Sequence, residues 1–360
     1  MVKRTESLLT CVQMMAARNP LGNVLLPIAI LTLLGVAWTT AEGADSWTLS
    51  SETSKTGSGT SWGIHRNGDP VTVAHANLKG TPGLYPLYSP SGLALTRSFP
   101  IEDAGSLERL DHDHHRSVWF THGLVNDVDF WIDDDKPNVG RVFQIESDAR
   151  HAAGGVIVES TNEWRDPDSI ILLTEQRSWQ FSDSIGDTVI DFHITLAAVD
   201  RPVFMGDTKE GSLGIRVAAS MKVDAGFGGR ITNAEGLTDK ATWSKASPWV
   251  DYSGPVAVGT YGPKPTREQI SSWPTAGITI MAHPNNEVTP TRWHVRTYGL
   301  FAANPFGRHH FGLPAYDGVE IVPSKPLHLS YRIVLHDGPL DVAKTQRHFD
   351  AFSAKVVAAR

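Results

Sequence analysis

The fold class is decided by one stretch of sequence, Thr188-Val189-Ile190-Asp191-Phe192-His193-Ile194-Thr195-Leu196-Ala197-Ala198-Val199. Large apolar side chains alternate along it with polar or small ones. A second stretch, residues 326–336, alternates in the same way. This period of two predicts β-strands with one face in a core and the other facing solvent or a cleft.

Weaker versions of this pattern predict further strands over residues 155–164, 170–181, 213–219, 277–283 and 293–302. The 32 glycines and 22 prolines divide the intervals into short turns, as all-β domains require. One helix is expected at the C-terminus, starting at Pro339, with an apolar stripe of Val342, Phe349, Phe352 and Val356. We therefore predict an all-β chain: a large antiparallel β-sandwich of roughly fifteen or more strands with a short C-terminal helix.

The N-terminus has the features of a signal peptide, which we assign to residues 1–44. Arg18 precedes an apolar run over 21–38, and the small residues Ala41 and Gly43 suit a cleavage site. The alternative is an uncleaved anchor helix, but the run contains a proline and is shorter than the ~20 residues that span a bilayer. Cleavage would make this an exported protein, periplasmic or extracellular.

The rest of the chain is expected to be one domain. Residues 45–60 are rich in Ser, Thr and Gly and form a flexible lead-in or a weak first strand, and 61–360 form a single β-sandwich domain. The only cysteine, Cys11, lies in the leader, so the mature chain has no disulfide and no thiolate. A net charge of −7 argues against nucleic acid as a partner. No second apolar run is long enough for a membrane span.

The region 111–131 has the composition of a small-molecule site. It contains four histidines, four acids, an arginine, an asparagine and two tryptophans. Buried imidazoles and carboxylates cost free energy unless they are partnered, so a core strand does not need this mixture. Groups that donate, accept or titrate, next to flat aromatic faces, suit a ligand pocket. The candidate residues here are Asp111, His114, His115, Trp119, His122, Asn126, Asp129 and Trp131.

His112 and His114 are also a candidate metal pair. On a strand, residues two apart point to one face, and Asp111 and Asp113 could ligate or orient the rings. A third ligand would come from elsewhere, such as Glu210 or His283. The alternative is that these histidines bind a polar ligand without metal. No cofactor is therefore required, and a divalent metal is possible.

Two further segments carry candidate groups. Glu210 lies in a glycine-flanked charged segment, 206–216, where Lys209 and Arg216 could tune its charge, although a charged hairpin turn is an equally plain interpretation. Residues 293–310 combine aromatic rings with polar groups, as sugar sites do. From these segments we add Asp207, Lys209, Arg216, Arg296, Asn304 and His309 as ligand-binding candidates, and interpret Trp293, Phe301 and Phe306 as core.

Four blocks of the chain resemble a bacterial family of exported proteins of unknown function, abundant in planctomycete-type genomes. These are residues 85–100, 111–131, 207–216 and 298–307. The family usually has proline where this sequence has Asp113, and a glycine-like turn near Asp127. It is often labelled "methane oxygenase PmoA", which implies an integral-membrane copper subunit. A single leader followed by a β pattern disagrees with that label.

The pattern also resembles the supersandwich architecture of galactose mutarotases and related carbohydrate enzymes. This resemblance implies an imidazole and a carboxylate acting as an acid–base pair, His114 or His115 with Glu210. Arg97 and Arg216 would orient hydroxyls, and Trp119 or Trp131 would stack on the sugar. We expect an exported carbohydrate-active enzyme of epimerase, lyase or hydrolase type, acting on a small-molecule or oligosaccharide ligand. The alternatives are a non-catalytic glycan-binding protein and a metal-dependent oxygenase.

Overall fold

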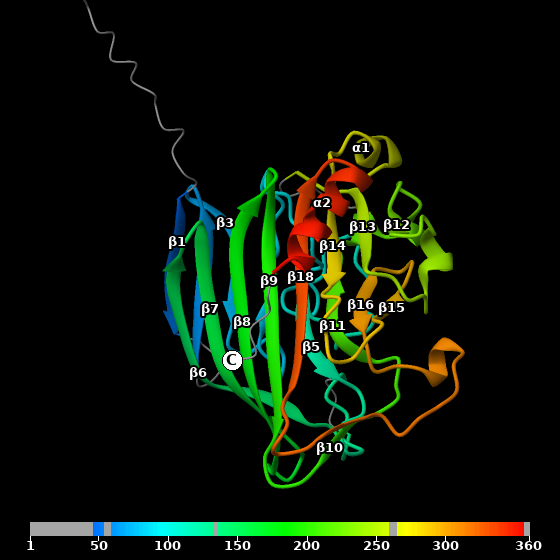
Figure 1. Ribbon diagram of the computed structural model, residues 1–360. Helices are drawn as coiled ribbons and strands as arrows, with labels where there is room; N and C mark the ends of the chain where they lie inside the picture. The colour runs from blue at the N-terminus through cyan, green and yellow to red at the C-terminus, as the bar shows by residue number, and fades with distance from the viewer. Residues whose placement is uncertain (1–45, 54–58, 133–135, 259–264, 356–360) are drawn as a thin grey trace, which may run out of the picture. The chain divides into compact units, whose positions relative to one another are not determined.

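The computed structural model describes residues 46–53, 59–132, 136–258 and 265–355 (Figure 1). Within these ranges the chain forms 18 β-strands, two α-helices and four short 3-10 helices. Gly43–Arg360 is one compact unit. The signal peptide predicted for residues 1–44 lies outside the described residues.

The first large sheet has eight strands in the order β1-β2-β3-β4-β5-β11-β16-β15. Its neighbours all pair antiparallel. The strands are β1 (Trp47–Thr53), β2 (Thr60–Arg66), β3 (Asp69–His75), β4 (Gly83–Leu84), β5 (Val118–His122), β11 (Gly211–Arg216), β16 (Leu300–Asn304) and β15 (Arg292–Val295).

The second large sheet is also antiparallel and has eight strands in the order β12-β13-β14-β18-β9-β8-β7-β6. They are β12 (Arg230–Asn233), β13 (Trp249–Pro255), β14 (Thr275–Ala282), β18 (Leu327–Asp337), β9 (Asp187–Ala198), β8 (Ile171–Ser184), β7 (Gly155–Arg165) and β6 (Arg141–Ala152). A separate two-stranded sheet joins β10 (Val203–Met205) to β17 (Val319–Ile321).

The two large sheets share one hydrophobic core. A single cluster of buried side chains draws on strands of both sheets. At its centre the ring of Phe120 on β5 lies 5.7 Å from that of Phe192 on β9. Burial of this apolar surface is the main stabilising contribution, at roughly 1.5–3 kcal/mol for each large side chain. The prediction of an all-β antiparallel sandwich is therefore confirmed.

The alternating stretch 188–199 is strand β9, and its polar face is covered. Asp191 accepts two hydrogen bonds from the Arg332 guanidinium of β18, at 2.7 and 2.8 Å. Helix α2 (Val342–Ser353) lies over this face, and Arg332 also donates to the His348 carbonyl. A sequence period of two predicts that one face of a strand packs in the core. It does not predict that a helix covers part of the other face.

Three local predictions are corrected. Trp47–Thr53 form strand β1, paired along its length with β2, so for these residues the first of the two alternatives, a flexible lead-in, is wrong and the other, a first strand, is confirmed. The strand predicted over 293–302 is a hairpin, β15 and β16, because Gly299 (φ +103°) closes a turn by donating to the Arg296 carbonyl. Helix α2 starts after Asp341, whose side chain accepts from the Lys344 amide, rather than at Pro339.

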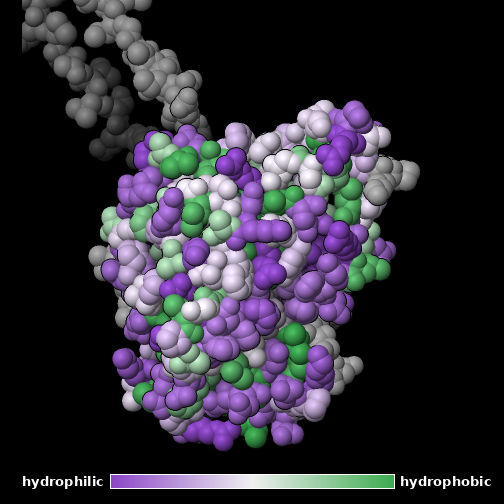
Figure 2. Space-filling model, turned by 90° about the vertical axis from the view of Figure 1, so that its right-hand side faces the viewer, coloured by the Kyte–Doolittle hydropathy of each residue, from purple (hydrophilic) through white to green (hydrophobic). Residues whose placement is uncertain are grey.

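A second, five-residue helix, α1 (Arg267–Ser271), was not predicted. None of the helices among the described residues has the length and apolarity to cross a membrane. Figure 2 shows a face on which hydrophobic residues are scattered among hydrophilic ones rather than gathered in one broad patch.

Candidate functional site

The histidines of the site lie on a loop, not on a strand. Residues 111–117, here called the histidine loop, precede β5, and His115 donates its backbone N–H to the His112 carbonyl at 3.0 Å. His112 has a left-handed backbone (φ +46°), as has Ser117 (φ +33°). The expectation that His112 and His114 share a strand face is therefore wrong, because the loop turns between them.

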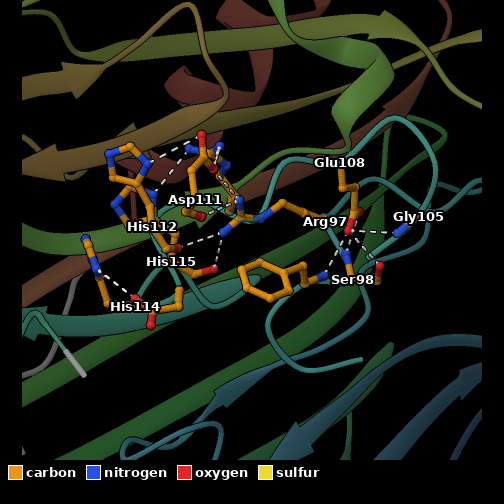
Figure 3. Close-up of polar contacts among 11 residues, drawn as sticks. Arg97, Ser98, Gly105, Glu108, Asp111, His112, His114 and His115 are labelled. Carbon is orange, nitrogen blue, oxygen red and sulfur yellow. Dashed lines mark hydrogen bonds and ion pairs between the residues drawn. The ribbon is translucent and has the colours of Figure 1, made fainter. Parts of the chain in front are cut away.

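Two buried arginines hold the histidine loop. Arg97 donates to the Asp111 carboxylate and carbonyl, both at 2.9 Å, and to the His112 carbonyl at 2.8 Å (Figure 3). Arg216 on β11 donates to the same carboxylate oxygen at 3.1 Å. Both arginines are only 2 % exposed. Both terminal nitrogens of Arg97 thus donate to protein atoms of the loop, and Arg97 is not part of the described pocket lining. Arg97 was predicted to orient a substrate, but in the structure it shapes the loop.

The electrostatics of this anchor favour the ionised carboxylate. Burial raises the pKa of Asp111, but Arg216, His112 and Arg97 together outweigh burial and lower it below its usual value. Burial in turn lowers the pKa of Arg216 to about 10, assisted by repulsion from Arg97. Two buried cations therefore share one carboxylate, and the pair of arginines carries an excess of positive charge.

The histidine rings of the loop pack against neighbouring aromatic rings. The His112 ring is nearly parallel to those of His115, at 4.7 Å, and Tyr298, at 5.1 Å, and the His115 and Tyr298 rings are also parallel, at 6.4 Å. His115 in turn stacks on Trp119, at 5.6 Å, and Trp119 contacts Trp131, at 4.9 Å. Trp119 is wholly buried behind this stack, so it supports the site rather than meeting a ligand directly.

A pocket of about 360 Å3 opens at the exposed end of this stack. It is bounded by the histidine loop, by the segment that enters β11, and by the β15–β16 hairpin. Its lining residues are His112, His114, His115, Trp131, Ile132, Lys209, Glu210, His294, Arg296 and Tyr298. The structure thus brings together predicted residues from three segments that are distant in the sequence. The volume of the pocket falls within the range of ligand pockets.

Three imidazoles of the pocket, those of His114, His115 and His294, are neutral at physiological pH. Burial, with repulsion from Arg116 and His112, lowers the pKa of His114 to about 4. Burial, with the charges of His114 and Arg216, also lowers the pKa of His115. Arg216 donates to Nδ1 of His115 at 3.2 Å, which places the His115 proton on Nε2.

Glu210 is the carboxylate of the pocket. Its Oε1 pairs with Lys209 Nζ at 2.8 Å, and its Oε2 lies 3.8 Å from His294 Nδ1. Burial raises its pKa, but His294 and Lys209 outweigh burial and lower it. Glu210 is 29 % exposed, so the ionised group remains accessible from the pocket. It is therefore a proton acceptor.

The described residues contain no complete set of ligands for a metal ion. The His112 and His114 rings meet edge to face at 5.7 Å, and no group of three His, Cys, Asp or Glu among the described residues could hold an ion. His283, one of the predicted third ligands, packs instead against Phe352 of α2. The divalent metal stays a prediction.

Three residues predicted from 111–131 are used by the fold. His122 is wholly buried, with Nε2 2.7 Å from the Gly206 carbonyl. Asn126 bridges the chain to β10 by accepting from the Phe204 amide at 2.9 Å. Asp129 accepts from the Trp131 and Ile132 amides, at 2.8 and 3.2 Å. Each lies outside the described pocket lining, and Asp129 fixes the backbone at Trp131 and Ile132, which line the pocket.

Three residues predicted from the other two segments also lie outside the described pocket lining. Asp207 accepts from the Arg308 and His309 amides, at 2.6 and 3.0 Å. Asn304 accepts from the Phe306 and Gly307 amides and donates to the Thr208 carbonyl. His309 is exposed outside the pocket lining that the structure describes. Asp207 and Asn304 shape the loops beside Glu210 rather than binding ligand.

Three pocket residues were missed, namely His294, Tyr298 and Ile132. His294 and Tyr298 stand two residues before and after Arg296, which was predicted. His294 lies on β15, where a spacing of two could have pointed to it, but Tyr298 lies in the turn after the strand, where period two gives no signal. Ile132 gave no such signal.

Comparison with known proteins gives a family without an assigned activity. The sequence model of a family of unknown function (DUF6807) matches residues 64–350. No curated protein matches the sequence. Among solved structures, the chain is similar to the GalM/aldose epimerase homologue from C. elegans, with 10 % sequence identity, covering 83 % of this chain and 100 % of that chain. The TM-score is 0.31. At that value the likeness supports no conclusion, and any function must be argued from the pocket.

Proposed function

We propose that this chain, which belongs to a family of unknown function (DUF6807), binds a sugar in the described pocket and acts on it with Glu210 as the base. The observation that carries the proposal is an ionised, accessible carboxylate in a pocket lined by neutral imidazoles and aromatic rings. Rings pack against the C–H faces of a sugar, while charged and imidazole groups bind its hydroxyls.

The protonation states favour some reactions over others. Glycoside hydrolysis commonly uses two carboxyl groups, one of them held protonated by a raised pKa. Among the described lining residues Glu210 is the one carboxyl group, and its pKa is lowered. His114, with a pKa of about 4, is also unprotonated at neutral pH. Two proton acceptors suit abstraction of a proton from the sugar, so epimerase or lyase chemistry is favoured over hydrolysis.

Tyr298 and Lys209 are the proton donors for the same reaction. Tyr298 keeps its phenolic proton, because burial raises its pKa. Lys209 brings an ammonium to the carboxylate that would accept the proton. In this arrangement Glu210 takes a proton from the sugar, and the charge that develops on the sugar oxygen is stabilised by hydrogen bonds from Tyr298 or Lys209.

The test is the Glu210→Gln variant, which keeps the shape of the side chain and removes its charge. Thermal unfolding against a panel of sugars first identifies the ligand: at about a hundred times its Kd, a ligand stabilises the folded state by ~2.7 kcal/mol, which is several degrees. Turnover of that sugar should then fall by at least about 100-fold in Glu210→Gln. The control is Glu320→Gln on β17, outside the pocket.

A non-catalytic glycan-binding protein is the second candidate. The observation in its favour is that the lowered pKa values of His114 and His115 leave neither imidazole as an imidazolium acid at neutral pH. The same experiment separates the two functions. A binder would show a thermal shift without turnover, and Glu210→Gln would change only the affinity.

We also propose that the protein acts outside the cytoplasm, on the strength of the leader sequence in residues 1–44. N-terminal sequencing of the protein recovered after export should give a start close after Gly43 or Ala44. An unprocessed N-terminus on the exported protein would contradict cleavage.

A further inference from the structure

Arg296 is the one pocket cation whose guanidinium makes no hydrogen bond or ion pair with the residues that the structure describes. It lines the pocket next to Tyr298. Its guanidinium carbon lies 5.6 Å from the Trp243 ring centroid and 5.6 Å from that of Tyr298. Cation–π contacts on two rings hold the group in place without using its N–H donors. Five donors therefore remain for a ligand.

The neighbouring charges do not compensate Arg296. Lys209 and Glu210 form an ion pair with each other at 2.8 Å, so their charges cancel. Behind His115, Arg97 and Arg216 share the single carboxylate of Asp111. The described wall of the pocket thus carries a positive charge at Arg296, with a second excess charge behind the histidine loop. A positive wall around a cavity attracts an anionic ligand.

We infer that the sugar bound in this pocket is a sugar acid, and that Arg296 binds its carboxylate. This inference rests on the proposed function, because it places the carboxylate in the same pocket. The guanidinium presents parallel N–H groups in a plane, and their spacing matches the two oxygens of a carboxylate. Arg296 is the one uncompensated cation in the described pocket lining, and its single charge matches that of a carboxylate better than the two charges of a phosphate monoester.

Isothermal titration of the purified full chain with matched pairs of sugars tests the inference. Glucose with glucuronate, galactose with galacturonate and mannose with mannuronate differ only by the carboxylate. The acid of the preferred pair should bind at least about 10-fold more tightly than its neutral partner, and 0.5 M salt should reduce that preference.

Variants then assign the preference to Arg296. Arg296→Gln should abolish the preference, measured within that variant as the ratio of the Kd of the neutral sugar to the Kd of its acid. Arg296→Lys keeps the charge without the planar fork, and should retain only part of the preference. The matched control is Arg267→Gln, because Arg267 also lies over a ring, that of Phe227, but is outside the pocket. Circular dichroism checks that each variant is folded. If Arg296→Gln does not fold, the preference of Arg296→Lys decides.

The outcomes separate the inference from the proposed function. Neutral sugars that bind as tightly as their acids would overturn the inference and leave the sugar pocket standing. A preference that persists in Arg296→Gln, or in Arg296→Lys at full strength, would overturn the role of Arg296. Sulfated sugars that bind as tightly as uronates would overturn the choice of a carboxylate. No binding by any sugar would overturn both proposals.

Discussion

Asp111 should be the side chain on which the histidine loop depends most. Its carboxylate accepts from Arg97 at 2.9 Å and from Arg216 at 3.1 Å, and both arginines are 2 % exposed. Replacing it with Asn keeps an oxygen in the same place but removes the charge. Two buried guanidinium groups, already repelling each other, would then be left without a counter-charge.

The cost can be bounded from the exposure of the three groups. Removing one partner of a fully buried ion pair destabilises a protein by about 3–5 kcal/mol. Asp111 is 32 % exposed, so water screens part of the interaction. The neutral amide oxygen also keeps weaker hydrogen bonds. We therefore expect Asp111→Asn to lower the free energy of unfolding by about 2–3 kcal/mol.

Urea unfolding, followed by tryptophan fluorescence, measures this loss at pH 7. The matched control is Asp113→Asn, two residues away, because Asp113 is 71 % exposed and lies 3.6 Å from the His114 ring. That substitution should leave the midpoint unchanged within error, as exposed ion pairs contribute little. Equal midpoints for Asp111→Asn and the wild type would refute the reasoning, because the two arginines would then not need their carboxylate.

Two further predictions concern pH and the C-terminal helix. The pKa of His114 and of His294 is lowered from 6.5 to about 4 by burial, so the unfolded chain binds protons at a higher pH than the folded one. The free energy of unfolding should therefore fall as the pH drops from about 6.5 towards 4, by up to about 1.4 kcal/mol per pH unit for each histidine. His336, whose pKa is raised by Asp251 despite burial, opposes this trend. Urea unfolding at pH 7 and 5 measures the sum, and greater stability at pH 5 would contradict it. Asp341→Ala removes the cap of α2 and should cost about 1 kcal/mol, whereas Asp350→Ala, in the last turn of α2, should cost less; equal thermal midpoints would contradict the capping role.

The regular strands could be predicted from the sequence because their pattern is local. β7, β8, β9 and β18 match the predicted ranges within a few residues. The hairpin at 293–302 could not be separated from a single strand by periodicity alone, since residues on both sides of Gly299 alternate correctly. The start of α2 was misplaced because Pro339 and Asp341 are both common at helix N-termini. Only the hydrogen bond from the Lys344 amide to Asp341 decides between them.

The site was predicted less well than the fold, for a physical reason. The same type of polar residue can bind a ligand or a backbone amide, and the sequence does not distinguish the two roles. Asp207, Asn304 and Asp129 satisfy buried amides of nearby loops, and those amides would otherwise be left unpaired. Glu210 was identified correctly as a pocket residue, but its partner His294 was not. Which carboxylate remains accessible depends on contacts between distant segments, and no local pattern encodes them.

The two properties of the histidine loop, its shape and its charge state, have one origin. Arg216 shapes the loop through Asp111, and it also donates to His115, which excludes a proton from Nδ1. Loosening this anchor would therefore do more than move the loop, because it would also weaken the burial and the repulsion from Arg216 that lower the pKa of His115. His114 and His115 are neutral beside the Glu210 base of the proposed reaction, so neither of them adds a cation that would pair with the carboxylate. The unpaired positive charge that a ligand would meet in the described pocket lining is therefore that of Arg296.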